Sequence, residues 1–276
     1  YDLSTNDGVE MVRGIDEEVA TLDYDMILST SHHRRRKEAD HVANLTRGLV
    51  DGLLIVLPSN LDAYVENLAS LQYPFVLIDH QGLGRAGSGS IQATNYQGAY
   101  DATRHLLELG HRRIGTVTGP YSDPSAVNCA ADRLAGYRAA LEEAGIAFDP
   151  ALVHEGNFLF ESGHAGAQRL LALDRPPTAI FAGSDEGAFG VMAAAKARGL
   201  AVPADLSVVG FDDIPEASYR QPRLTTIRQP LRKMGQLAAR MLVCHIEDRS
   251  APLTRIELPT ELKIRATTAP PRAMRT

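Results

Sequence analysis

The chain has 276 residues, of which 44% are hydrophobic and 22% charged, and its formal net charge is −6 at pH 7. These fractions are typical of a globular protein with one large or two smaller domains, and they exclude an intrinsically disordered chain. Apolar runs such as Leu53–Leu57 are far shorter than the roughly 20 residues of a membrane-spanning helix. The acidic balance also argues against non-specific nucleic-acid binding by these residues.

The two cysteines, Cys129 and Cys244, lie far apart in the sequence. They exclude a disulfide framework and predict a reducing, cytoplasmic compartment. The chain opens on Tyr1-Asp2-Leu3-Ser4 without a Met or a signal peptide, which indicates a fragment of a longer protein.

Strand-like and helix-like patterns alternate along the chain. Strands are predicted at 25–28, 51–57, 74–79, 113–118, 178–182, 206–211, 255–258 and 261–264, and a new series of elements starts near Ile91. Apolar residues at helical spacing predict helices at 99–109, 134–144, 188–195 and 230–246. Gly110, Gly145 and Gly199 follow three of these helices, where a left-handed cap is expected.

This order of elements predicts an α/β fold. Repeated β-then-α units favour mostly parallel sheets with helices on both faces. The Gly-rich stretch 82–89 interrupts the rhythm, so two sheets are expected rather than one. Ligands of such sheets bind beyond the carboxyl ends of the strands, which directs the search to the loops that follow them.

Several motifs have no functional interpretation. Gly82–Gly87 matches G-x-G-x-x-G, but no helix begins there to hold a pyrophosphate, so a flexible surface loop is predicted. His32, His33 and His41 lack the spacing of a metal site, and Arg34–Lys37 is predicted to start an exposed helix. There is no Walker A loop and no G-x-S-x-G elbow.

The strand ends carry charged side chains. Asp79-His80, Ser184-Asp185 and Asp212-Asp213 each follow a predicted strand, and Arg133 opens the helix after the loop 119–132. Carboxylates accept and a guanidinium donates several hydrogen bonds, so this grouping suits a ligand rich in hydroxyl groups. The alternative is that Asp185 and Asp212 only cap helices.

Five segments resemble the LacI/GalR family of bacterial transcription regulators. They are Gly110–Gly115 (GHRRIG), Asp132–Leu141 (DRLAGYRAAL), Asp205–Asp213 (DLSVVGFDD), Leu224–Pro230 (LTTIRQP) and Pro259–Thr268 (PTELKIRATT). They occur in the family's order and span most of the chain, so the set is specific although each segment alone is weak.

The resemblance implies an effector-binding core of two Rossmann-like lobes joined by three crossovers, like the type I periplasmic binding proteins. The expected lobes are 1–92 plus 230–258 and 93–229 plus 259–276. The family's N-terminal helix-turn-helix, which contacts operator DNA, and most of the first strand of the core are missing from this sequence. A homodimer without a membrane partner is expected.

The resemblance also implies the site residues. Arg133 corresponds to the arginine that grips the effector, Asp212 to the aspartate opposite it, and Phe158 to the aromatic residue on which the effector packs. Further expected contacts are Asp79, His80, Ser184, Cys129 and Gln229. Ser184-Asp185 replaces the frequent Asn-Asp, and Ala93-Thr94-Asn95 replaces a frequent Asp-Asn, so no particular relative's ligand can be copied.

The expected function is a regulator core that binds a small polar effector, with a sugar favoured, and so controls operator binding. The alternative is a solute-binding protein of a sugar transporter. A third class, a sugar hydrolase that uses Asp79 and Asp212 as its carboxylate pair, has no supporting catalytic motif. The sequence therefore predicts neither an enzyme nor a cofactor.

Overall fold

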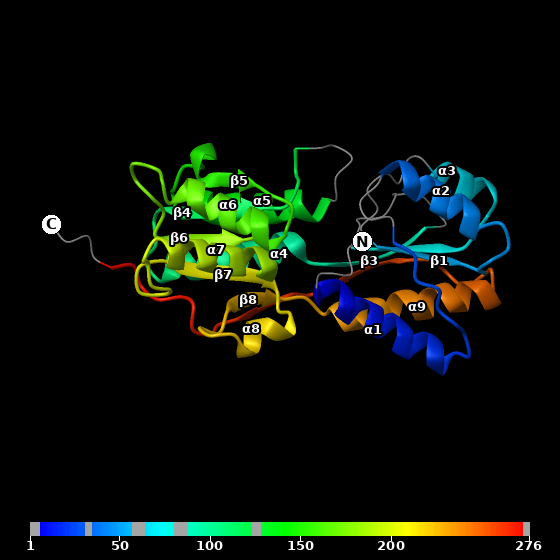
Figure 1. Cartoon of the computed structure of the whole chain (residues 1–276). Coiled ribbons are helices and arrows are strands. Elements are labelled where there is room, and N and C mark those ends of the chain that lie inside the picture. Colours follow the sequence, from blue (N-terminus) through cyan, green and yellow to red (C-terminus); the bar gives the residue numbers. More distant parts are fainter. Residues whose placement is uncertain (1–5, 31–34, 57–63, 80–87, 123–127, 273–276) are drawn as a thin grey trace. The chain divides into compact units, whose positions relative to one another are not determined.

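The computed structural model describes residues 6–30, 35–56, 64–79, 88–122 and 128–272 (Figure 1). These residues form two compact units. The first comprises the described residues up to Ala93 together with Pro230–Pro259. The second comprises Thr94–Ser122, Cys129–Gln229 and the described residues from Thr260 onward.

The first unit is built on a parallel sheet in the order β1-β2-β3-β9. Its strands are β1 (Leu53–Val56), β2 (Phe75–Ile78), β3 (Gly89–Ala93) and β9 (Arg255–Leu258), and its helices are α1 (Asn6–Thr21), α2 (Arg35–Leu45), α3 (Val65–Ser70) and α9 (Leu231–Glu247). Val76 and Ile78 belong to one buried cluster with α1 and α9, whereas Phe75 and Leu77 belong to another with α3. This alternation along β2 buries both faces of the sheet.

The strand predicted at 25–28 is not formed. Residues 24–30 have no regular secondary structure, and Ile27 and Leu28 are half exposed. These residues and β1 line a common cavity of about 660 Å³. An apolar run becomes a strand only when a neighbouring backbone accepts its hydrogen bonds, and within the described residues β1 pairs with β2 alone.

The second unit contains a six-stranded sheet in the order β10-β8-β7-β6-β4-β5, parallel except for β10. Its strands are β4 (Ile114–Thr118), β5 (Val153–Glu155), β6 (Ala179–Ala182), β7 (Ser207–Asp212), β8 (Thr225–Arg228) and β10 (Glu261–Lys263). Its α-helices are α4 (Asn95–Glu108), α5 (Asn128–Glu143), α6 (Phe160–Leu170), α7 (Asp185–Ala197) and α8 (Pro215–Tyr219).

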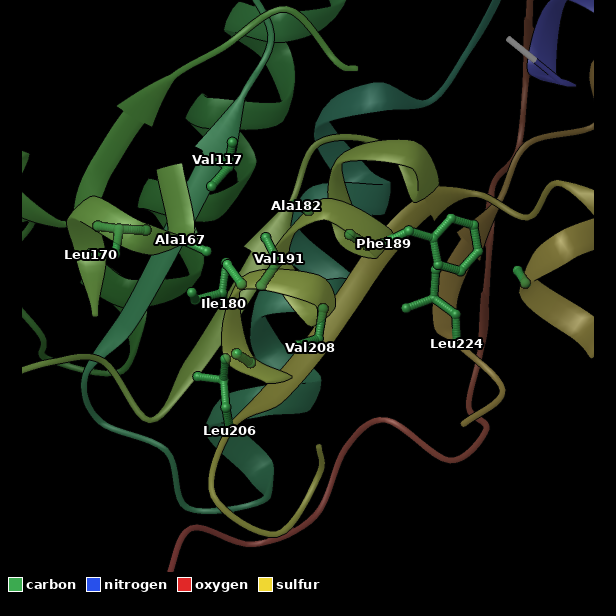
Figure 2. Close-up of a cluster of buried hydrophobic side chains, with 14 of the residues drawn as sticks. Val117, Ala167, Leu170, Ile180, Ala182, Phe189, Val191, Leu206, Val208 and Leu224 are labelled. Atoms are coloured by element: carbon green, nitrogen blue, oxygen red, sulfur yellow. The ribbon is translucent and has the colours of Figure 1, made fainter. Parts of the chain in front are cut away.

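Alternate residues of the central strands pack on opposite faces of this sheet. Ile180 and Val208 lie in the cluster formed with α6 and α7, which Figure 2 shows. Phe181 and Phe211 lie in the cluster formed with α4 and α5. The strands are therefore fully buried, as their continuous apolar sequences predict.

Most of the sequence expectations for the fold are confirmed. Mostly parallel sheets with helices on both faces are present, and the four predicted helices form as α4, α5, α7 and α9. Gly110, Gly145 and Gly199 have φ values of 97°, 70° and 73°, as their cap positions require.

Some predictions fall outside the described residues. These are the glycine-rich loop 82–87, His32, His33 and the first residue of the basic run, Arg34; α2 begins directly after it at Arg35. Within the described parts of the chain, His, Cys, Asp and Glu side chains form no group that could hold a metal ion. Among the helices described, none is long and apolar enough to cross a bilayer.

Hydrogen bonds of the buried His111 ring join the segment after β10 to the sheet. The His111 ring nitrogen Nδ1 lies 2.8 Å from Thr178 Oγ1, and Nε2 lies 3.0 Å from both Ser207 Oγ and Ala269 O. Burial lowers the pKa of His111, and the hydrogen bond to the Ala269 carbonyl oxygen opposes this shift only in part. The neutral ring is thus the form that the folded chain favours.

This arrangement predicts an acid-sensitive stability. The pKa of His111 is lower in the folded chain than in the unfolded chain, where it is about 6.5. At pH values between these two pKa values, the unfolded chain therefore binds more protons than the folded chain. The free energy of unfolding should be highest above about pH 6.5 and should fall as the pH drops through and below that value. Urea denaturation from pH 8 to pH 5 measures it.

His111→Gln should lower stability at pH 8 but flatten this pH dependence. His164→Gln, at a partly exposed position of α6, is the matched control and should keep the wild-type slope. An unchanged slope in His111→Gln would contradict the assignment.

Candidate functional site

The carboxyl ends of β6, β7 and β8 carry three of the predicted site residues. After β6 come Gly183 and then Ser184. Asp212 is the last residue of β7, and Gln229 directly follows β8. The three strands are neighbours and parallel, so their ends meet at one edge of the sheet. This is the edge at which α/β sheets bind ligands.

Arg133 of α5 is the cation of this edge, and its side chain is only 5% exposed. Its Nε donates a hydrogen bond to Asn95 Oδ1 at 2.9 Å, and Nη1 donates to the carbonyl oxygen of Gly183. Nη1 also lies 3.7 Å from Asp212 Oδ1, within ion-pair distance. A guanidinium keeps its charge in proteins, so a permanent buried cation faces a carboxylate here.

Two aromatic rings flank this guanidinium. The Arg133 Cζ atom lies 3.8 Å from the ring centre of Phe211 and 5.4 Å from that of Phe158. The Phe158 ring occupies the space next to Gly119, where an added Cβ would lie 2.0 Å from the ring. A glycine at 119 is therefore required for Phe158 to reach Arg133. Cation–π contacts of this kind orient and stabilise a desolvated cation.

Asp212 and Gln229 are joined by two hydrogen bonds. Gln229 Nε2 donates to Asp212 Oδ1 at 2.7 Å, and the Gln229 N–H donates to the Asp212 carbonyl oxygen at 3.1 Å. Both residues are buried. Gln229 Oε1 accepts no hydrogen bond from the described residues, so an acceptor lies next to the carboxylate.

Ser184 uses its hydroxyl within the protein. The oxygen accepts a hydrogen bond from the Gly187 N–H at 3.0 Å, which makes Ser184 the N-cap of α7. The same hydroxyl donates to the Phe158 carbonyl oxygen at 2.5 Å. The capping alternative for Asp185 and Asp212 is therefore wrong, because Ser184 caps α7 and α8 has no side-chain cap.

The other predicted residues lie at separate places. Cys129 is buried one helical turn before Arg133 on α5. Asp79 belongs to the first unit, where it follows β2 with φ 55° and donates its N–H to Ile91 O at 2.8 Å. His80 lies outside the described residues.

Sequence reasoning missed two contacts of the guanidinium. Asn95 belongs to the stretch noted as a departure from the family, but its bond to Arg133 joins α4 to α5 and has no local signal. Phe211 precedes Asp212, and strand alternation assigns it to the core, which is where it lies. The Arg133 Cζ atom lies 3.8 Å from the centre of this core ring.

The fold is that of a known class of proteins. Residues 103–268 match the family described as the periplasmic binding protein-like domain. The transcriptional repressor PurR of Edwardsiella ictaluri is 35% identical over 261 residues, which cover 94% of this chain and 75% of PurR.

Solved structures of LacI family regulators are also similar to this chain. A LacI family regulator from Enterococcus faecium with bound ribose is 30% identical, with a TM-score of 0.86 over 98% of this chain and 96% of that one. The transcriptional regulator CelR in complex with cellobiose is 31% identical, with a TM-score of 0.82 over 94% of this chain and 78% of that one. The chain belongs to the LacI family of transcriptional regulators and covers its effector-binding core.

The buried cation predicts a strong dependence of stability on Arg133. Arg133→Met keeps an apolar stem but leaves the buried Asp212 carboxylate without its cation, so the free energy of unfolding should fall by about 3–5 kcal/mol. Urea denaturation at pH 7 measures the change.

Arg104→Met is the matched control, because Arg104 lies on a helix of the same unit and its exposed side chain pairs with Asp101 at 3.2 Å. That exposed pair is worth less than about 1 kcal/mol. Equal losses in the two variants would show that the Arg133 contacts are not stabilising.

Proposed function

We propose that the chain binds a sugar as its effector at the Arg133–Asp212 site, and that sugar binding changes the affinity of the regulator for operator DNA. The observation that carries this proposal is a buried guanidinium that contacts two aromatic rings and lies within ion-pair distance of a carboxylate. A sugar offers both donors and acceptors on a ring with apolar faces, which this combination of groups matches.

Each part of the site has a role in this proposal. The Arg133 guanidinium donates to hydroxyl oxygens, and the Asp212 carboxylate and Gln229 Oε1 accept from hydroxyl hydrogens. The Phe158 ring packs on the apolar face of the sugar. The other predicted contacts of the effector are Ser184, Cys129, Asp79 and His80. The ribose and cellobiose complexes of two relatives support a sugar over other polar effectors.

The proposed output is operator binding. PurR, a relative across 94% of the chain, is a transcriptional repressor, which supports regulation over catalysis. A coupling free energy of about 1–3 kcal/mol between the effector and DNA sites would change operator affinity about 5–150-fold. The proposal includes a cytoplasmic homodimer that contacts DNA through a helix-turn-helix, as the family resemblance implies.

Isothermal titration calorimetry tests the proposed site. A panel of mono- and disaccharides that includes D-ribose should contain a sugar that binds the wild-type chain. Arg133→Ala should weaken that binding about 10–100-fold, because charge-assisted hydrogen bonds contribute about 1.5–3 kcal/mol. Asp212→Asn should weaken it in the same direction.

Arg104→Ala is the control and should bind the sugar as the wild type does. Circular dichroism must show that each variant is folded at the temperature of the titration. Equal affinity of Arg133→Ala and the wild type would contradict the assignment of the site. A chain that binds no sugar in the panel would contradict the assignment of the ligand class.

A further inference from the structure

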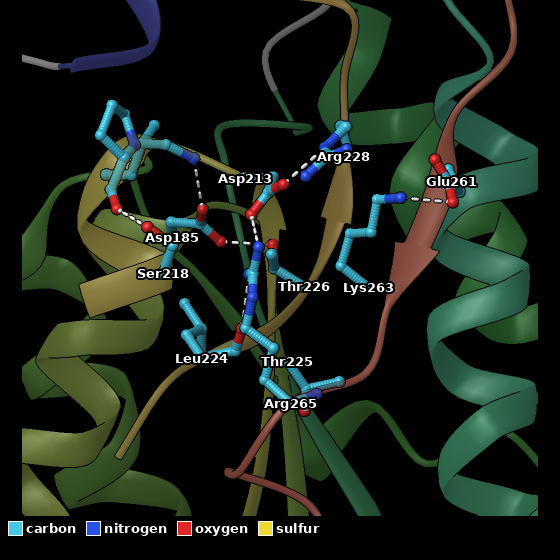
Figure 3. Close-up of polar contacts among 12 residues, drawn as sticks. Asp185, Asp213, Ser218, Leu224, Thr225, Thr226, Arg228, Glu261, Lys263 and Arg265 are labelled. Carbon is cyan, nitrogen blue, oxygen red and sulfur yellow. Dashed lines mark hydrogen bonds and ion pairs between the residues drawn. The ribbon is translucent and has the colours of Figure 1, made fainter. Parts of the chain in front are cut away.

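Asp185 is a fully buried carboxyl group directly behind the site. Its Oδ2 accepts a hydrogen bond from the Ile214 N–H at 2.9 Å, and its Oδ1 accepts one from the Thr226 hydroxyl. Figure 3 shows the Asp185 carboxyl group beside Thr226. One side chain thus joins the start of α7, the turn after β7 and strand β8.

A glycine at position 210 leaves room for the Asp185 side chain. A Cβ at Gly210 would lie 2.3 Å from Asp185 Oδ1, which is closer than any packed Cβ contact. Gly210 is two residues before Asp212 on β7. The strand that presents Asp212 therefore passes directly over the Asp185 carboxyl group.

The turn that Asp185 contacts has an unusual backbone. Asp212 and Asp213 have φ values of 118° and 60°, which side chains other than glycine rarely adopt. Such a conformation persists only when the surrounding groups determine it. Each residue of the turn 212–214 has its own partner.

Those partners come from different elements. Asp212 receives the hydrogen bonds of Gln229. Asp213 pairs with Arg228 and Arg265, each at 2.6 Å (Figure 3). Ile214 donates its N–H to Asp185. Two of these contacts reach β8, which Gln229 directly follows: Asp213 pairs with Arg228 of that strand, and Asp185 accepts a hydrogen bond from its Thr226.

The charge state of Asp185 is consistent with a structural hydrogen-bonding group. Burial, reinforced by the negative charge of Asp212, raises the pKa of Asp185 well above its ordinary value. When protonated on Oδ1, this carboxyl group accepts from the Ile214 N–H through Oδ2 and donates to the Thr226 hydroxyl oxygen through Oδ1. An asparagine amide offers the same acceptor and donor in nearly the same volume.

We propose that Asp185 is a positioning residue for the effector site: it holds the turn 212–214 and strand β8 together, so that Asp212 and Gln229 are presented to the sugar. This inference rests on the proposed function for its effect on binding. Asp185 itself does not contact the sugar.

The test compares four variants in D-ribose titration calorimetry and in hydrogen–deuterium exchange without a sugar. Asp185→Ala should weaken ribose binding at least tenfold, and Thr226→Val, which removes one hydroxyl donor, should weaken it several-fold. Asp185→Asn should stay within about threefold of the wild type. Val208→Ala changes a buried core residue of β7, the strand that ends in Asp212. Its ribose affinity should stay within about twofold of the wild type although its melting temperature falls.

The exchange arm reports the turn directly. Asp185→Ala and Thr226→Val should speed exchange at the Ile214 and Gln229 amides about tenfold or more relative to strand β6, and Val208→Ala should not show this local effect. If Asp185→Ala does not fold, Thr226→Val carries both measurements.

Exchange at Ile214 and Gln229 that matches the control would overturn the proposal. So would ribose binding weakened equally by Val208→Ala. If the wild-type chain does not bind ribose, ribose is excluded as the effector, and the exchange arm still decides whether Asp185 positions the turn.

Discussion

The contacts of one buried guanidinium, that of Arg133, hold together several elements of the second unit. Removing an arginine charge from water costs several kcal/mol, so the fold must supply partners for it. Arg133 obtains them from α4 through Asn95, from the end of β6 through the Gly183 carbonyl, and from the end of β7 through Phe211 and Asp212. Each of these elements therefore has its end fixed with respect to α5.

Around this cation the parts of the site are held in place by contacts within the protein. The Ser184 hydroxyl fixes the Phe158 carbonyl, and the missing side chain of Gly119 lets the Phe158 ring approach. On the other side, Gly210 leaves room for Asp185 beneath the strand that ends in Asp212. A site whose parts are already fixed loses less conformational entropy when a ligand binds.

The sequence predicted the parts of this arrangement that topology determines. Parallel strands place their carboxyl ends together, and Asp212, Gln229 and Ser184 lie at neighbouring ends, as expected. It did not predict the role of the Ser184 hydroxyl, because a bond to the Phe158 carbonyl joins residues 26 positions apart. Asn95 and Phe211 were missed for the same reason, since their contacts with Arg133 depend on packing between elements.

The strand predicted at 25–28 shows that an apolar composition alone does not produce a strand. Its apolar residues have the right composition, but a strand needs backbone partners, and the described residues supply none there.

We propose that the Arg133 guanidinium and the Asp212 carboxylate together bind the sugar effector. A crystal structure of the chain with the sugar that most raises its melting temperature is the most direct measurement. Sugar hydroxyls are expected within about 3.2 Å of both the Arg133 guanidinium and the Asp212 carboxylate. A sugar bound away from these two groups, or a guanidinium that keeps only its protein partners in the complex, would contradict it.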